Sequence, residues 1–157
     1  MTGAAPFASR SGLIDIEETA VFAPKFDADG LIPAIAADAA SGQVLMFAWM
    51  NAEALAATLS SGMAHFYSRS RATLWQKGET SGEALKVARV LTDCDQDVIL
   101  IEVVPQGLGA ACHTGRRACF YREVTGQGGQ MRLKLTGEAP LFDPAKVYGK
   151  PGGGDRA

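Results

Sequence analysis

The run of residues 98–104 constrains the fold of this 157-residue chain more than any other stretch. Its sequence, Val-Ile-Leu-Ile-Glu-Val-Val, is apolar with one exception and rich in β-branched side chains. Such a run is typical of a strand that is covered on both faces, so it is predicted to be a central strand. Further strands are predicted at residues 31–37, 43–49, 63–70, 85–92 and 119–124, the first two as a hairpin.

The clearest helix follows the second of these strands. Asn51 is a good N-cap, Glu53 favours the positive end of the helix dipole, and Gly62 is placed to end the helix. A short second helix is predicted at 144–148, with Pro144 in its first turn. Because long helical crossovers are scarce, the sequence predicts an α+β fold, a mainly antiparallel β-sheet with a few flanking helices.

Composition excludes some classes of function. With 47% hydrophobic and 20% charged residues, the chain is an ordinary globular protein. A flexible leader is expected at 1–11, one domain at 12–148 and a disordered tail at 149–157. Net charge is −2, and no apolar run approaches the ~20 residues of a membrane-spanning helix, so neither nucleic acid nor membrane is an expected partner. Residues 1–11 lack a secretory signal, which predicts a cytoplasmic protein.

Three aspartates alternate with other residues just before the central strand. Asp93, Asp95 and Asp97 would share one face of an extended segment, and Cys94 would point to the other. Carboxylates suit magnesium, whereas thiolates suit zinc. In a straight strand Asp93 and Asp97 would lie about 13 Å apart, so either the segment bends or waters complete the magnesium shell. The alternative is a polar turn with solvated aspartates.

Three cysteines, Cys94, Cys112 and Cys119, are all that the chain contains. An odd number cannot pair completely, and a reducing compartment disfavours disulfides. Three thiolates would bind a zinc ion and leave its fourth position open for water, as in catalytic zinc sites. The spacing of Cys112 and Cys119 is not that of a zinc ribbon, so small buried hydrophobes are the alternative interpretation.

His113 follows a candidate ligand directly and is predicted to be catalytic, handling protons beside the metal. A hydrogen-bonded structural histidine is the alternative, and His65 is the reserve candidate. Three thiolates on a zinc dication leave a net charge of −1. Arg116, Arg117 and His113 are near enough in sequence to offset it.

Four segments in order carry a resemblance to a known family: Phe66-Tyr67-Ser68-Arg69-Ser70-Arg71, Leu74-Trp75-Gln76-Lys77-Gly78-Glu79-Thr80-Ser81-Gly82, Asp93-Cys94-Asp95-Gln96-Asp97, and Cys112-His113-Thr114-Gly115 with Cys119-Phe120-Tyr121. With them, the chain resembles phosphoribosyl-AMP cyclohydrolase of histidine biosynthesis, from about residue 31 to residue 122. The resemblance implies a hydrolase that opens the adenine ring of 1-(5-phosphoribosyl)-AMP between N1 and C6.

The resemblance also implies Zn²⁺, Mg²⁺ and an intertwined homodimer with shared zinc sites. Cys94 of one chain would meet Cys112 and Cys119 of the other. Magnesium would lie on Asp93, Asp95 and Asp97.

A substrate with two phosphates requires cations and hydrogen-bond donors. The residues predicted to bind it are Arg69, Arg71, Trp75, Lys77, Thr80 and Ser81. Trp75 is predicted either to stack on a base or to lie in the core.

Two other functions compete with this one. A structural zinc-binding interaction module would explain the cysteines but neither the aspartates nor the segment 75–82. A zinc nucleobase deaminase is expected to carry Pro-Cys-x-x-Cys, which this chain lacks.

Overall fold

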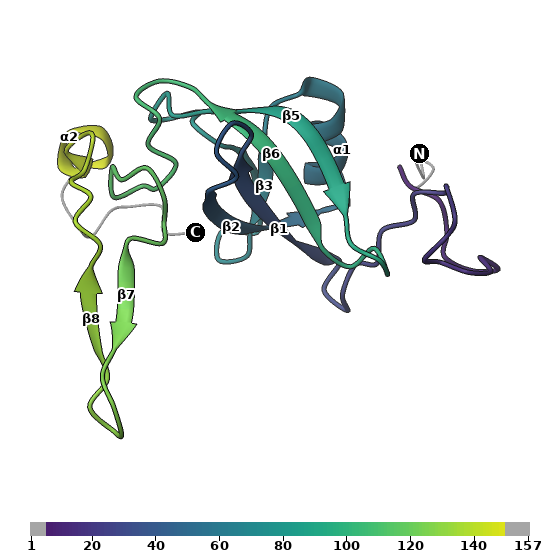
Figure 1. Cartoon of the computed structure of the whole chain (residues 1–157). Coiled ribbons are helices and arrows are strands. Elements are labelled where there is room, and N and C mark those ends of the chain that lie inside the picture. Colours follow the sequence, from purple (N-terminus) through teal and green to yellow (C-terminus); the bar gives the residue numbers. More distant parts are fainter. Residues whose placement is uncertain (1–5, 150–157) are drawn as a thin grey trace.

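A computed structural model describes residues 6–149 and contains one four-stranded sheet (Figure 1). The strand order is β2 (Val44–Asn51), β1 (Leu31–Asp38), β6 (Ile99–Pro105) and β5 (Leu85–Thr92). The outer pairs β1–β2 and β5–β6 are antiparallel, and β1 and β6 run parallel in the middle. The predicted central strand is therefore confirmed, and so is the first hairpin.

Two smaller hairpins accompany this sheet. The first consists of β3 (His65–Ser68) and β4 (Thr73–Gln76), and the second of β7 (Arg122–Thr125) and β8 (Arg132–Leu135). Figure 1 shows the β7–β8 hairpin standing away from the main sheet. Its apolar side chains Val124, Met131, Leu133 and Leu135 are exposed. The predicted α+β fold with mainly antiparallel pairing is thus confirmed.

Helix α1 (Ala52–Ser61) begins and ends where its sequence signals predict. The side chain of Asn51 accepts a hydrogen bond of 2.8 Å from the Ala54 N–H, and Gly62 adopts φ +71°. Both features satisfy helix-end groups that would otherwise lack partners. The helix packs against the sheet through Leu55, within a core that includes Ile32, Phe66 and Ile101.

Several predicted boundaries were wrong. The strand predicted at 63–70 is shortened to β3, and neither β4 nor β8 was predicted. The strand predicted at 119–124 begins only at Arg122, because the Cys119 N–H donates to the Leu45 carbonyl (2.7 Å) and ties that end to β2. Helix α2 (Pro144–Tyr148) has the predicted bounds.

The ends of the chain lie partly outside the described residues. This holds for residues 1–5 of the predicted leader and 150–157 of the predicted tail. Within the described part of the leader, the ring of Phe7 packs edge-on against Phe22, with centroids 5.5 Å apart. Among residues 6–149, no helix has both the length and the apolar character needed to cross a membrane.

Candidate active site

Cys112 and Cys119 meet in a tight loop that follows β6. The loop is closed by backbone hydrogen bonds from Ala111 to Arg117 (3.1 Å) and from Cys112 to Arg116 (3.0 Å). The Cys119 thiol hydrogen-bonds Cys112, which lowers the pKa of Cys112 to about 5 and raises that of Cys119. The Thr114 hydroxyl donates to the Cys112 sulfur at 3.1 Å. A thiolate is the form in which cysteine binds zinc, so the pair fits that ion.

Cys94 does not join this pair within the chain. It is exposed in the turn before β6, whereas Cys112 lies beyond the other end of that strand. A strand of this length spans about 20 Å, at ~3.3 Å per residue. The structure therefore brings together two of the three predicted zinc ligands.

A cavity beside the cysteines gathers most of the predicted functional residues. Those that line it are Arg71, Trp75, Lys77, Thr80, Ser81, His113 and Cys119. The turn after β4 places Thr80 and Ser81 in the wall. This turn needs Gly78 for two reasons: its φ is +86°, and a Cβ there would collide with the backbone of Ala84.

Arg69 lies in a second cavity rather than beside Arg71. Its guanidinium carbon is 5.1 Å from the ring centroid of Trp49, an arrangement typical of cation–π contacts. Phe47 and Trp75 line both cavities. Trp75 is half-buried and packs against Phe66, so it both supports the core and faces the cavities.

The acidic segment bends, which confirms one of the two predicted alternatives. Within residues 6–149, Asp93, Asp95 and Asp97 form the one group of three candidate ligands with all ligand atoms within 4.8 Å of one another. Gln96 adopts φ +60° at the bend. Burial works against ionisation of Asp93, but the N–H groups of Val98 and Asp97 outweigh it and lower its pKa. The hydrogen bond to Asp93 raises the pKa of Asp97. Clustered carboxylates of this kind fit a divalent cation.

Comparisons with known proteins decide the family. The family model for phosphoribosyl-AMP cyclohydrolase matches residues 46–121. The chain is 50% identical over 139 residues to the phosphoribosyl-AMP cyclohydrolase of Sinorhizobium fredii, covering 88% of this chain and 91% of that one. It is 54% identical to the enzyme of the same name from Nitrobacter hamburgensis, covering 86% and 91%. The chain belongs to the phosphoribosyl-AMP cyclohydrolase family. The relative from Rhodopseudomonas palustris is 56% identical over 135 residues, covering 85% and 91%.

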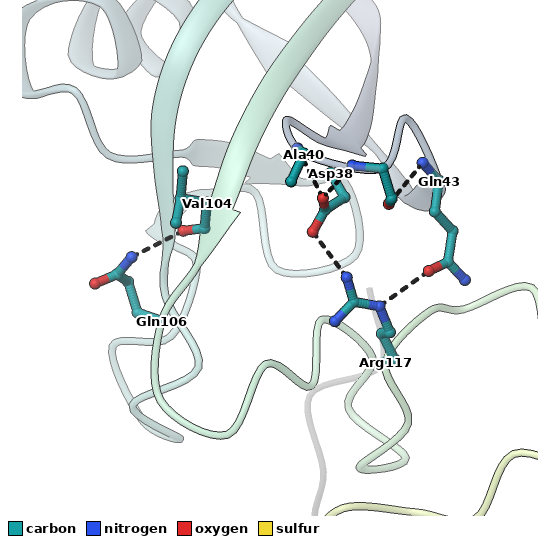
Figure 2. A network of polar contacts seen from close by, with 7 residues as sticks. Asp38, Ala40, Gln43, Val104, Gln106 and Arg117 are labelled. Atoms are coloured by element: carbon teal, nitrogen blue, oxygen red, sulfur yellow. Dashed lines mark hydrogen bonds and ion pairs between the residues drawn. The ribbon is translucent and has the colours of Figure 1, made fainter.

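The two arginines of the cysteine loop are engaged away from the cysteines in this family member. Arg117 donates to the buried carboxylate of Asp38 (2.8 Å) and to the Gln43 side chain (2.9 Å), as Figure 2 shows. The N–H of Ser41, then that of Ala40 and the charge of Arg117, lower the pKa of Asp38 despite its burial. The Arg116 guanidinium lies over the Tyr121 ring, 4.1 Å from its centroid.

The two histidines differ in position. His113 lines the cavity with Cys119. His65 lines neither of the two cavities, and its Nδ1 lies 2.8 Å from the Met63 carbonyl oxygen. Of the two histidines, therefore, only His113 lies at the cavity beside the cysteines.

Two buried polar residues near the site were missed. Glu83 accepts hydrogen bonds from the backbone N–H groups of Leu108 (3.0 Å) and Ala110 (2.9 Å). Gln96 accepts from Ala23 (2.8 Å) and donates to the carbonyl of Val21 (3.2 Å). Both sit in polar stretches, and their partners are distant in sequence, so no local pattern marks either residue.

The C-terminal segment closes one side of the cavity. The Leu141 N–H donates to the Gly115 carbonyl (2.7 Å), and Tyr148 of α2 lines the cavity. Gly115 has no space for a Cβ, which would collide with the Phe142 carbonyl. The role of Tyr148 was not foreseen, because it follows the segments that carry the family resemblance.

Proposed function

We propose that this chain hydrolyses the N1–C6 bond of the adenine ring in 1-(5-phosphoribosyl)-AMP, as a zinc- and magnesium-dependent step of histidine biosynthesis. The observation that carries the proposal is the single cavity in which His113 and Cys119 lie beside Arg71, Thr80 and Ser81. Such a cavity combines a metal ligand, a proton carrier and phosphate-binding groups. Membership in the phosphoribosyl-AMP cyclohydrolase family supports this choice of substrate.

The zinc ligands of the proposal come from two chains. Cys112 and Cys119 supply two sulfurs, and Cys94 of a second copy supplies the third. Cys94 lies at the opposite end of β6, so one chain cannot close the site without rearrangement. A symmetric dimer would hold two identical shared sites. Asp93, Asp95 and Asp97 would hold magnesium, next to Cys94 in the same bend.

His113 carries the proton in the proposed reaction. Alkylation at N1 makes C6 of the adenine ring more open to attack. When bound, zinc supplies Lewis-acid activation of the attacking water. His113 accepts a proton as the oxygen adds to C6 and returns it to N1 as the C6–N1 bond breaks. The water oxygen thus ends as the carbonyl oxygen at C6. One of its hydrogens ends on N1, and the other completes the NH2 group of the new carboxamide when the substrate reacts as its neutral imino form.

The two cavities are proposed to hold the two ribose phosphate groups of the substrate, which are attached on opposite sides of the adenine base. Arg71, Thr80 and Ser81 bind one phosphate, and Arg69 binds the other from the second cavity. The shared wall, which includes Trp75, would separate these groups on either side of the base. An Arg69→Gln substitution should raise KM more than it lowers kcat. An unchanged KM would place the second phosphate elsewhere.

An ultraviolet assay of ring opening tests the activity. Purified protein is expected to open the ring, to lose this activity after chelation and to regain it with zinc. A protein that binds zinc but leaves the substrate unchanged would instead favour the structural zinc-binding interaction module.

A complementation experiment tests the shared site. Cys94→Ala and Cys112→Ala chains should each be inactive. Refolded together in equal amounts, they should recover about a quarter of wild-type activity, because half of the dimers are mixed and each mixed dimer holds one intact site of two. Absence of recovery, with mixed dimers present, would refute ligand exchange between chains.

A further inference from the structure

We propose that the buried ammonium of Lys77 faces Cys112 and Cys119 and offsets their negative charge, rather than binding a substrate phosphate. Glu83 holds Lys77 and the cysteine loop in position. The inference rests on the proposed zinc site. The sequence predicts instead that Lys77 binds a substrate phosphate. The experiment below distinguishes the two roles.

Lys77 is buried to a degree that is unusual for lysine. Its relative exposure is 6%, whereas Arg71 on the same cavity is exposed. Its Nζ donates to the backbone carbonyl of Glu83 at 3.3 Å. A buried ammonium is costly unless acceptors or opposite charges surround it. The groups around Lys77 must therefore stabilise its buried ammonium.

Those groups are acidic. Burial lowers the pKa of Lys77, and the charges of Cys119, Glu83 and Cys112 act in the opposite direction. Lys77 and Cys119 line the same cavity. The two arginines nearest the cysteines in sequence are directed to Asp38 and Tyr121. The ammonium of Lys77 is thus placed to do what the sequence suggested for Arg116 and Arg117.

Glu83 links the lysine to the cysteine loop. Its carbonyl accepts from Lys77, and its buried carboxylate accepts from Leu108 and Ala110, just before Cys112. Gly107 lies against this carboxylate, since a Cβ there would be 2.7 Å from Oε1 of Glu83. One residue therefore fixes the lysine and the loop relative to each other.

The chemistry explains why a cation is needed here. Three thiolates would give a zinc site a net charge of −1, and this lowers the Lewis acidity of the ion. A neighbouring ammonium opposes that charge, and it acts more strongly in a buried site than in water. Groups of this kind around the ligands tune both metal affinity and reactivity.

The test compares three variants at this position. Lys77→Met removes the charge and keeps the length, Lys77→Gln keeps a donor for the Glu83 carbonyl, and Lys77→Arg keeps the charge. Zinc affinity is measured by chelator competition on the full-length protein, and cobalt absorption reports the thiolate site. Thermal unfolding identifies variants that fail to fold, and Lys77→Gln replaces Lys77→Met if the latter unfolds.

The neutral variants are expected to lose about 10–100-fold in zinc affinity and a comparable factor in kcat, with KM nearly unchanged. Lys77→Arg should retain more of both. Unchanged zinc affinity in a folded neutral variant, with or without a raised KM, would overturn the inference. Failure of the wild-type protein to open the ring would instead count against the proposed activity, because the affinity measurement does not require turnover.

Discussion

The two ends of β6 carry two very different loops. Beyond its C-terminal end, the cysteine loop is held by its own backbone bonds, by Glu83 and by the Arg117–Asp38 pair. Before its N-terminal end, the acidic bend is more open to solvent, and Gln96 ties it to residues 21–25. The comparison teaches that the same strand can carry a loop fixed by many contacts, with Cys112 buried and Cys119 exposed, and a bend whose aspartates remain open to water. Fixed thiolates are what zinc favours, and partly hydrated carboxylates are what magnesium favours.

The largest contrast should appear when one ligand is removed from each loop. Cys119→Ser is expected to lower ring-opening activity by about 10⁴-fold or more, because water activation at neutral pH depends on the metal. Asp97→Asn should cost much less, with zinc content unchanged in a metal analysis. Equal losses from both substitutions would show that the two loops do not act as separate metal sites.

Replacing the proton carrier should have the next largest effect. His113→Ala is expected to reduce kcat by about 10²–10⁴-fold with zinc content intact, which is the usual range for a general acid–base group. His65→Ala is the matched control and should stay near wild type. The reverse order of activities would assign proton transfer to His65.

Loosening the acidic bend sharpens the comparison further. Gln96→Ala should lower magnesium affinity by about 10-fold and the free energy of unfolding by about 1–3 kcal/mol, because the buried N–H of Ala23 and the carbonyl of Val21 lose their partner. Zinc affinity should not change. Gln106→Ala is a suitable control, since the Gln106 amide binds only its near neighbour Val104 in the contacts drawn in Figure 2. A weaker zinc site in Gln96→Ala would couple the two loops.

The smallest effect concerns the anchor of the cysteine loop at low pH. The pKa of Asp38 is lower in the folded chain than in the unfolded one, so its contribution is present above the unfolded value of about 3.9 and is lost as pH falls through the folded value. Asp38→Asn should cost about 1–2 kcal/mol of unfolding free energy at pH 7 and less in acid. Asp29→Asn, at an exposed turn, should change stability by less than about 0.5 kcal/mol at either pH. A cost for Asp38→Asn that does not depend on pH would show that its charge contributes nothing.

Local signals predicted the parts of this molecule that local forces decide. Asn51 and Gly62 mark α1 because caps act on their own helix, and the apolar run before Pro105 marks β6. The strand predicted at Cys119 failed because its N–H bonds to Leu45, far away in the sequence.

The same limit applies to the site. The residue types of the cavity were recognisable from the sequence, but the placement of Arg69 and Arg71 in different cavities follows from the fold, which puts Arg69 against Trp49 of β2. The groups that the side chains of Glu83 and Gln96 contact lie 25 or more residues away, so the roles of these side chains became visible only in three dimensions.

The parallel pairing of β1 with β6 has a consequence for how the polypeptide is made. During synthesis β1 and β2 leave the ribosome early and can pair at once. The other edge of β1 has no partner strand until β6 has been synthesised. Nascent chains would therefore expose an unpaired apolar strand edge through much of synthesis, and such an edge promotes aggregation. Because β6 separates the two ligand loops, the strand that ends this vulnerable period is also the one that sets their spacing.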